Sequence, residues 1–469
     1  MKNSIIRNLT QGLHVYINID NFDSLLKKEE TSQHSIKHSL KLLNSFFVAI
    51  RRYVNHKWNF PGLHVEKVTG SRMHLYIEIG KNSNCTKEWC AQELLLLAAY
   101  SRKAIDYLNT DIAKLNKNDD ATISIGADYG KFRAFEFYDE KDGIDEETSI
   151  GFSANYACKL QTIVKGISRL AVSKEVMGLM SEDAKCHFTQ EKSASLIKYS
   201  SDENGVYYSA LLRILSTEIK VSFNPDEIRE ITNKINFSEM TFSRVKKRFN
   251  VKSLTEKDSK VFEGIALFSD IRGFTSQFKD DDSNLKEKSA QAIRGISLMI
   301  RNVLEYDGNH IQVQGDKEVA VFPLEYEPEN GESIRDAVNC ALSIVDEMRT
   351  AKLNVGIGMS YGDVYASIVD IRGSKSNVIL GETVTLGNEL EDKCAEPNEL
   401  VISSDLYNKL SEYDESKYLC GYFKKRDHYY VTKKSFNDIL TEEQNRRLNE
   451  ETRNKNYYGV HYIENKKGL

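Results

Sequence analysis

Two aspartates in the second half of the sequence stand where apolar runs give way to turns. Asp270 ends a run that begins at Gly264, and Asp316 lies in a Gly-Asp pair between two short β-type runs. Such a pair predicts a hairpin, and a hairpin beside the first strand would bring both carboxylates to one end of a sheet. Paired carboxylates suit a hard cation such as Mg²⁺ or Mn²⁺, which binds triphosphates. On spacing alone, a helix cap and a plain turn residue explain these aspartates at least as well.

The elements around these aspartates occur twice along the chain. In the second half the pattern predicts a strand at 264–270, then a helix, a hairpin, a second helix and a second strand that ends near 359. The first half has the same order between residues 14 and 125. A repeat of this kind predicts an α+β fold built from two similar units.

The repeat divides the chain into four parts. We expect one domain at 1–215, a helical linker at 216–258, a second domain at 259–435 and a charged tail at 436–469. The linker carries a basic cluster between residues 244 and 248, which we interpret as a solvated helix face.

Composition excludes several classes of function. The 64 Lys and Arg residues against 69 Asp and Glu give a net charge of −5, which excludes a broadly basic nucleic-acid coat. The longest apolar run, Leu94 to Ala99, is far short of the ~20 residues of a membrane span, and no apolar leader is visible at the start. Seven scattered cysteines fit a reducing compartment. We therefore expect a cytoplasmic protein with no nucleic-acid or membrane partner.

The motifs of the second half resemble a known family. Phe268-Ser-Asp-Ile-Arg-Gly-Phe-Thr275, followed by Gly315-Asp316, closely resembles the metal-binding signature of class III nucleotidyl cyclases. Residues 356–364 and 379–391 resemble later motifs of the same family, and the first half is a more divergent copy. The resemblance implies two ferredoxin-like (palm-type) cyclase homology domains that pair head to tail as an intramolecular pseudo-dimer.

In that family the metal ligands and the base-reading and transition-state residues come from different partners. The resemblance assigns two Mg²⁺ or Mn²⁺ ions to Asp270, Asp316 and the carbonyl of Ile271. The other positions of the second half depart from the family pattern, since they hold Gln312, Val378, Thr385 and Glu389.

The first half departs at the opposite positions. Asn18 and Ser71 occupy its metal positions, but the resemblance assigns base reading to Lys67 and Thr148. It also assigns ribose positioning to Asn155, transition-state charge to Lys159 (a lysine in place of the usual arginine) and the β- and γ-phosphates to Lys198. These complementary losses imply one composite active site and one inactive pseudo-site. A catalytically dead nucleotide-sensing module remains the alternative.

The implied reaction is attack of a ribose 3′-hydroxyl on the α-phosphorus, which releases pyrophosphate and a 3′,5′-cyclic nucleotide. A Lys67 donor beside a Thr148 acceptor suits a ring nitrogen next to an amino group, so we expect CTP or ATP rather than GTP or UTP. Arg72, next to the hairpin turn, either narrows the pocket or lies at the surface. The compact chain resembles the pyrimidine cyclases of bacterial Pycsar anti-phage systems, which implies antiviral defence and a product-sensing effector. We therefore favour cyclic CMP over cyclic AMP. A palm-type polymerase would need a second acid at the hairpin turn, where Lys317 stands.

Overall fold

The structure is a computed structural model. It describes residues 3–7, 9–33, 36–57, 63–79, 86–111, 120–139, 144–197, 204–234, 241–245, 249–254, 258–274, 285–324, 330–371 and 374–432.

The first unit is a mixed sheet with helices packed on it. Its central strands run in the order β3-β4-β2-β5-β7-β9-β8, and β1 and β6 pair with the two edges of the long strand β5. The strands are β1 (Asn3–Ile6), β2 (Thr10–Ile19), β3 (Leu63–Thr69), β4 (Arg72–Glu78), β5 (Ile123–Asp139), β6 (Ile144–Ile150), β7 (Arg169–Val172), β8 (Thr189–Lys192) and β9 (Val206–Leu211). The helices are α1 (Phe22–Gln33), α2 (Lys37–Lys57), α3 (Lys87–Asp111), α4 (Phe152–Ile163), α5 (Lys174–Gly178), α6 (Glu182–Lys185) and α7 (Leu212–Glu218).

The second unit repeats the seven-strand order of this sheet as β12-β13-β11-β14-β16-β18-β17, with β15 on β14 as β6 is on β5. Its strands are β11 (Asp258–Ile271), β12 (Asn309–Gln314), β13 (Lys317–Pro323), β14 (Val355–Ile371), β15 (Ser374–Leu380), β16 (Glu399–Ser403), β17 (Phe423–Arg426) and β18 (Tyr429–Thr432). Its helices are α10 (Leu285–Glu305), α11 (Asn330–Thr350), α12 (Glu382–Glu389) with the π-helical turn η3 (Leu390–Cys394), and α13 (Ser404–Glu412). The predicted α+β repeat is therefore confirmed.

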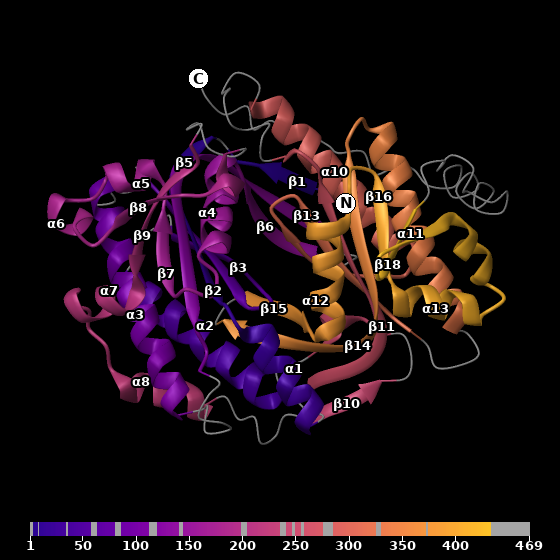
Figure 1. Ribbon diagram of the computed structural model, residues 1–469, viewed down its shortest axis with the longest axis horizontal. Coiled ribbons are helices and arrows are strands. Elements are labelled where there is room, and N and C mark those ends of the chain that lie inside the picture. Colours follow the sequence, from indigo (N-terminus) through magenta and orange to yellow (C-terminus); the bar gives the residue numbers. More distant parts are fainter. Residues whose placement is uncertain are drawn as a thin grey trace.

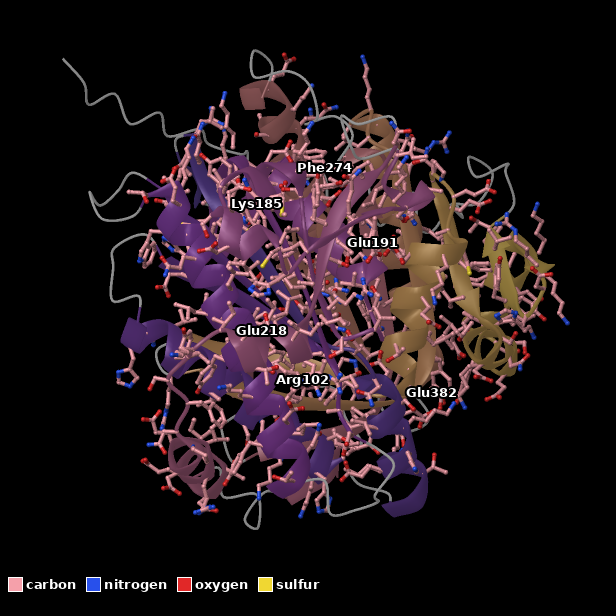
Figure 2. The ribbon with its side chains drawn as sticks, turned by 60° about the vertical axis from the view of Figure 1, so that its left-hand side comes forward. Arg102, Lys185, Glu191, Glu218, Phe274 and Glu382 are labelled. Atoms are coloured by element: carbon pink, nitrogen blue, oxygen red, sulfur yellow. The ribbon has the colours of Figure 1, made fainter. Side chains whose placement is uncertain are left out.

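The two units lie side by side, the first in indigo and magenta and the second in orange and yellow (Figure 1). In the turned view of Figure 2, Glu191 of β8 marks the first unit and Glu382 of α12 the second. Strands β3 and β6 of the first unit contact β15 and β12 of the second. The faces that meet are therefore those that carry the two hairpins.

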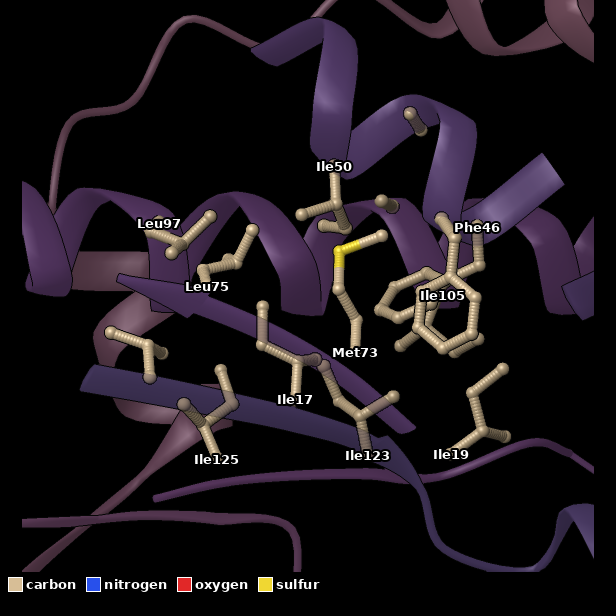
Figure 3. Close-up of a cluster of buried hydrophobic side chains, with 14 of the residues drawn as sticks. Ile17, Ile19, Phe46, Ile50, Met73, Leu75, Leu97, Ile105, Ile123 and Ile125 are labelled. Atoms are coloured by element: carbon tan, nitrogen blue, oxygen red, sulfur yellow. The ribbon is translucent and has the colours of Figure 1, made fainter. Parts of the chain in front are cut away.

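Each unit has an apolar core to which the other unit also contributes, since Val378 and Leu380 join the first core and Phe135 and Phe137 join the second. Helices α2 and α3 cover one face of the first sheet, where Phe46, Ile50 and Ile105 pack against Ile17 and Met73 (Figure 3). Helices α10 and α11 cover the second sheet in the same way. The alternating strands and the amphipathic helices bury their apolar faces against each other, which fixes the strand ends that carry the site.

The connector between the units is only partly helical. It holds α8 (Pro225–Lys234), which packs on α2, and the strand β10 (Thr241–Val245), which pairs in parallel with β11. Arg244 of the predicted basic helix face lies on that strand and forms an ion pair with Asp363. The domain boundaries at 215, 258 and 435 stay a prediction. Across the described ranges, none of the helices is long and apolar enough to cross a membrane.

Candidate active site

The two aspartates meet at one end of the second sheet. Asp270 stands opposite Lys317 in the antiparallel β11–β13 pair, and Asp316 precedes Lys317 in the hairpin turn. Gly315 opens that turn with a φ of 66°, a backbone conformation that glycine adopts without steric cost. The predicted convergence of the two carboxylates is a feature of the structure.

Burial and mutual repulsion make this carboxylate pair costly to ionise. Burial, with the Glu391 charge, raises the pKa of Asp270 to about 6. Burial also raises the pKa of Asp316 far above its usual value, and the neighbouring Asp270 charge raises it further. Lys317 and Lys159 act in the opposite direction on both groups.

Two cationic side chains beside this pair, Lys317 and Arg272, make their shortest ionic contacts with Glu391. Lys317 forms an ion pair with Glu391 and donates to Asn388 Oδ1 at 3.1 Å. Arg272 lies 2.7 Å from Glu391 Oε1 but 3.4 Å from Asp270 Oδ2. Glu391, on η3, is fully buried and anchors both cations. The two aspartates thus offer oxygen ligands to a divalent cation, and these residues fit such an ion.

Helix α4 brings two residues of the first unit to this hairpin. Asn155 and Lys159 are four residues apart and share one face of the helix. A Cβ built on Gly315 would lie 3.3 Å from Asn155 Oδ1, so the amide stands directly against the turn. The charge of Lys159 lowers the pKa of both Asp270 and Asp316, so it lies within electrostatic reach of the carboxylate pair. Residues predicted from opposite halves of the chain are therefore together.

The predicted base-reading residues also meet, around a carboxylate that sequence reasoning missed. Lys67 Nζ donates to the carbonyl of Val313 across the interface and lies 3.2 Å from Glu66 Oε1. Thr148, buried on β6, donates to the same Glu66 oxygen at 3.3 Å. The sequence does show a charged residue, Glu66, next to Lys67 in a predicted strand. Its side chain points inward because of an irregularity in the β3–β4 register, which the sequence pattern does not reveal.

Three other predicted residues are Lys198, Ile271 and Arg72. Lys198 lies outside the described residues. The side chain of Ile271 is buried in the second core. Metal binding by its backbone carbonyl stays a prediction. Arg72 NH1 donates to Cys158 Sγ of α4 at 3.0 Å, so its guanidinium is held within the first unit.

The predicted pseudo-site has neutral residues where the first site has carboxylates. Ser71 Oγ donates to Asn18 Oδ1 at 3.0 Å, and Asn18 donates in turn to Asp20. Helix α1 adds acidic groups on this side, since Asp23 accepts from Thr385 Oγ1 at 3.2 Å. Glu389 forms an i,i+4 ion pair with Lys393 in its own unit. This arrangement is unfavourable to a triphosphate.

A buried histidine links the two units beside the site. His310 Nε2 lies 2.9 Å from Glu146 Oε1 of β6, and its Nδ1 lies 2.7 Å from Glu318 Oε1 of β13. Burial lowers the pKa of His310, but the two carboxylates outweigh it and raise the pKa to about 9. Glu146 also accepts from the backbone N–H of Val313, so one side chain holds two positions of β12.

Comparisons with known proteins agree with the fold and with the motifs of the second unit. The family model for the adenylate and guanylate cyclase catalytic domain matches residues 258–439. A curated relative, the uridylate cyclase of Pseudomonas aeruginosa, is 23% identical over an alignment of 414 positions that covers 82% of this chain and 75% of the relative. The crystal structure of a class III adenylyl cyclase-like ATP-binding protein from P. aeruginosa superposes with a TM-score of 0.69 at 19% identity. It covers 92% of this chain and 91% of that chain, and it shows a shared fold.

Residues 258–439 match the adenylate and guanylate cyclase catalytic domain, so the second unit is a nucleotidyl cyclase domain, and the chain as a whole resembles the class III nucleotidyl cyclases, in which divalent-metal dependence is general. Within the class it resembles the pyrimidine cyclases of Pycsar systems, since its curated relative forms a cyclic pyrimidine nucleotide by name.

Proposed function

We propose that this protein converts CTP to 3′,5′-cyclic CMP and pyrophosphate at a single composite site between its two units. The observation that carries the proposal is the meeting of Lys159 and Asn155 of α4 with the Asp270–Asp316 pair. A site of this kind holds positive charge and a polar amide opposite metal-binding oxygens, as phosphoryl transfer requires.

Each residue has a role that follows from its place. Asp270 and Asp316, with the carbonyl of Ile271, would hold two Mg²⁺ or Mn²⁺ ions, which when bound lower the pKa of the 3′-hydroxyl and neutralise phosphate charge. Asn155 orients the ribose, and Lys159 offsets charge that develops on the α-phosphoryl group. Lys198 is proposed to contact the β- and γ-phosphates.

The base assignment rests on hydrogen-bond polarity. Lys67 is a donor, and Thr148 accepts while its own proton is directed to Glu66. Cytosine presents a ring nitrogen beside an amino group, which matches this pair. Adenine presents the same edge, so ATP is the purine alternative. The likeness to a uridylate cyclase favours UTP as a second candidate. In line with the Pycsar resemblance, we propose that a separate effector protein reads the product during antiviral defence.

Incubation of the purified protein with Mn²⁺ and each of ATP, CTP, GTP and UTP, followed by mass spectrometry, tests the substrate. We expect cyclic CMP as the main product. Cyclic UMP or cyclic AMP as the main product would overturn the choice of base but leave the cyclase. Nucleotide binding with no product from any of the four would favour a sensing module.

The carboxylate positions of the two halves provide matched variants for the one-site proposal. Asp270→Asn and Asp316→Asn remove a charge from the proposed metal site and should abolish turnover. Asn18→Ala changes the equivalent position of the pseudo-site and should leave kcat close to wild type. Equal losses from all three, measured as cyclic nucleotide formed per minute, would contradict a single composite site.

A further inference from the structure

A buried carboxylate lies behind the proposed base pocket, and no role above accounts for it. Glu66 lies on β3 where the register with β4 shifts between Val65 and Lys67, so neighbouring side chains turn toward the same pocket. Its side chain is 1% exposed, and that of Lys67 is 11% exposed. The equivalent place in the second hairpin holds the apolar Ile311, so this carboxylate is a feature of the composite site alone.

Four neighbouring groups converge on the two oxygens of Glu66. Oε1 lies 3.3 Å from the Thr148 hydroxyl and 3.2 Å from Lys67 Nζ. Oε2 accepts from Ser149 and lies 3.0 Å from His74 Nδ1. A carboxylate has about four lone-pair positions, so these neighbours occupy it fully. Glu66 therefore acts on the pocket through its neighbours rather than by touching a base itself.

A second layer of rings fixes the carboxylate in place. His74 stacks on Tyr16 at 4.1 Å between ring centroids, and its Nε2 lies 3.1 Å from His14 Nδ1. Burial opposes ionisation of Glu66, but the charges of His74 and Lys67 and the hydrogen bonds from His74 and Ser149 outweigh it and hold its pKa well below the usual range. The group is an acceptor at any ordinary pH.

We propose that Glu66 is the positioning residue that sets base specificity, because it commits the Thr148 hydroxyl proton and orients the Lys67 ammonium, so that the pocket selects cytosine over uracil. This inference rests on the proposed cyclase site. A hydroxyl has one proton, and with that proton on Glu66 the Thr148 oxygen presents only lone pairs. Lys67 has three donors, and Glu66 and the Val313 carbonyl direct two of them.

This polarity distinguishes the two pyrimidines. In the orientation that pairs Lys67 with the ring nitrogen, cytosine offers an acceptor to the ammonium and an amino donor to Thr148. Uracil offers an N–H to the ammonium and a carbonyl to the Thr148 lone pairs, so both contacts are mismatched. Without a fixed acceptor on Glu66, the Thr148 hydroxyl can rotate and donate to the uracil carbonyl, which removes one of the two mismatches.

The test is binding of 3′-deoxy-CTP and 3′-deoxy-UTP, which lack the attacking hydroxyl, beside cyclase assays with CTP and UTP. Glu66→Gln keeps the shape of the side chain but can donate to Thr148. We expect the preference for the cytosine nucleotide, as a ratio of Kd and of kcat/KM, to fall about tenfold. Thr148→Val should lose the preference to a similar extent, and combining it with Glu66→Gln should add little. Thr148→Val also keeps the test open if Glu66→Gln fails to fold.

Glu191→Gln is the matched control. Glu191 also accepts from several neighbours, Arg169, Ser209 and Tyr207, but it lies on β8 at the far edge of the same sheet (labelled in Figure 2). Its neutralisation should leave the ratio unchanged. Equal weakening of both nucleotides by Glu66→Gln, or a wild type that prefers the uracil nucleotide, would overturn the inference. Preferential binding without any cyclic product would instead refute the proposed activity while leaving the role of Glu66 supported.

Discussion

At the scale of single residues, the two halves carry opposite chemistry at equivalent positions. The hairpin turn holds Asp316 in the second half and Ser71 in the first. The strand position opposite the next residue is Asp270 in the second half and Asn18 in the first. On the helices, Lys159 of α4 corresponds to Glu389 of α12. Each exchange reverses or removes a charge, so only one of the two arrangements combines metal-binding carboxylates with a nearby cation.

The opposite charges of Lys159 and Glu389 predict that substitutions at these two equivalent positions have unequal effects on kcat. Lys159→Met removes the cation beside Asp270 and Asp316 and should lower kcat by about 100-fold or more, because charge on the transferring phosphoryl group is no longer offset. Lys159→Arg should retain much of the activity. Glu389→Gln, at the pseudo-site, should leave kcat near wild type. Initial rates at saturating nucleotide measure all three, and a large loss from Glu389→Gln would argue for two working sites.

At the scale of elements, helix α4 approaches the sheet unusually closely. A Cβ built on Gly126 of β5 would lie 2.2 Å from the backbone nitrogen of Gln161 and 2.3 Å from the carbonyl oxygen of Ala157. Gly358 of β14 has the same relation to Gly387 and Glu391 in the second unit. Glycine at these two positions therefore sets how deep each helix lies, and through α4 it sets where Asn155 and Lys159 stand.

Gly126→Ala should consequently affect both stability and activity. The added methyl meets backbone atoms that have no rotamer to change, so α4 must move away from the sheet, at a cost of about 1–3 kcal/mol or more. We expect a lower Tm together with a reduced kcat. Gly178→Ala is the control, since a Cβ there meets no atom within 4 Å. A Gly126→Ala protein with wild-type kcat would show that the depth of α4 does not matter for the reaction.

The elements were predictable from the sequence to a greater extent than the contacts between them. Periodic apolar residues and the Gly-Ser and Gly-Asp turns indicated both hairpins, and hence the end of the sheet where Asp270 and Asp316 meet. The roles of Glu66 and Glu391 were not predictable in the same way. Their importance comes from burial among partners distant in sequence, such as Thr148 for one and Arg272 for the other. No local pattern encodes those partners.

At the scale of the whole molecule, the composite site requires the two units to keep a fixed relation. Polar contacts beside the site cross between them: Lys67 to the carbonyl of Val313, and Glu146 to both the Val313 N–H and His310. All of them converge on β12, the strand that leads into the Asp316 turn. These polar contacts add to the apolar packing of Phe135 and Phe137 of the first unit in the second core, and together they keep the carboxylates beside Lys159.

His310 makes this contact dependent on pH. Its pKa of about 9 in the folded protein lies above the usual value of 6.5, so the charged ring, between Glu146 and Glu318 and with Lys252 nearby, stabilises the fold. This contribution is fully present below pH 6.5 and is lost as the pH rises through about 9. The difference corresponds to about 3 kcal/mol at most. We expect Tm to fall between pH 7 and 10, and cyclase activity to fall with it as the units separate.

The variant His310→Gln separates this effect from general alkaline destabilisation. Glutamine keeps a donor for one carboxylate but carries no titrating charge, so the variant should be less stable than wild type at pH 7 and nearly equal to it at pH 10. His187→Gln is a suitable comparison, because His187 faces Glu218 within the first unit, away from the interface. Melting curves at several pH values measure the convergence. Parallel curves for wild type and His310→Gln would mean that the buried histidine does not carry a charge across the interface.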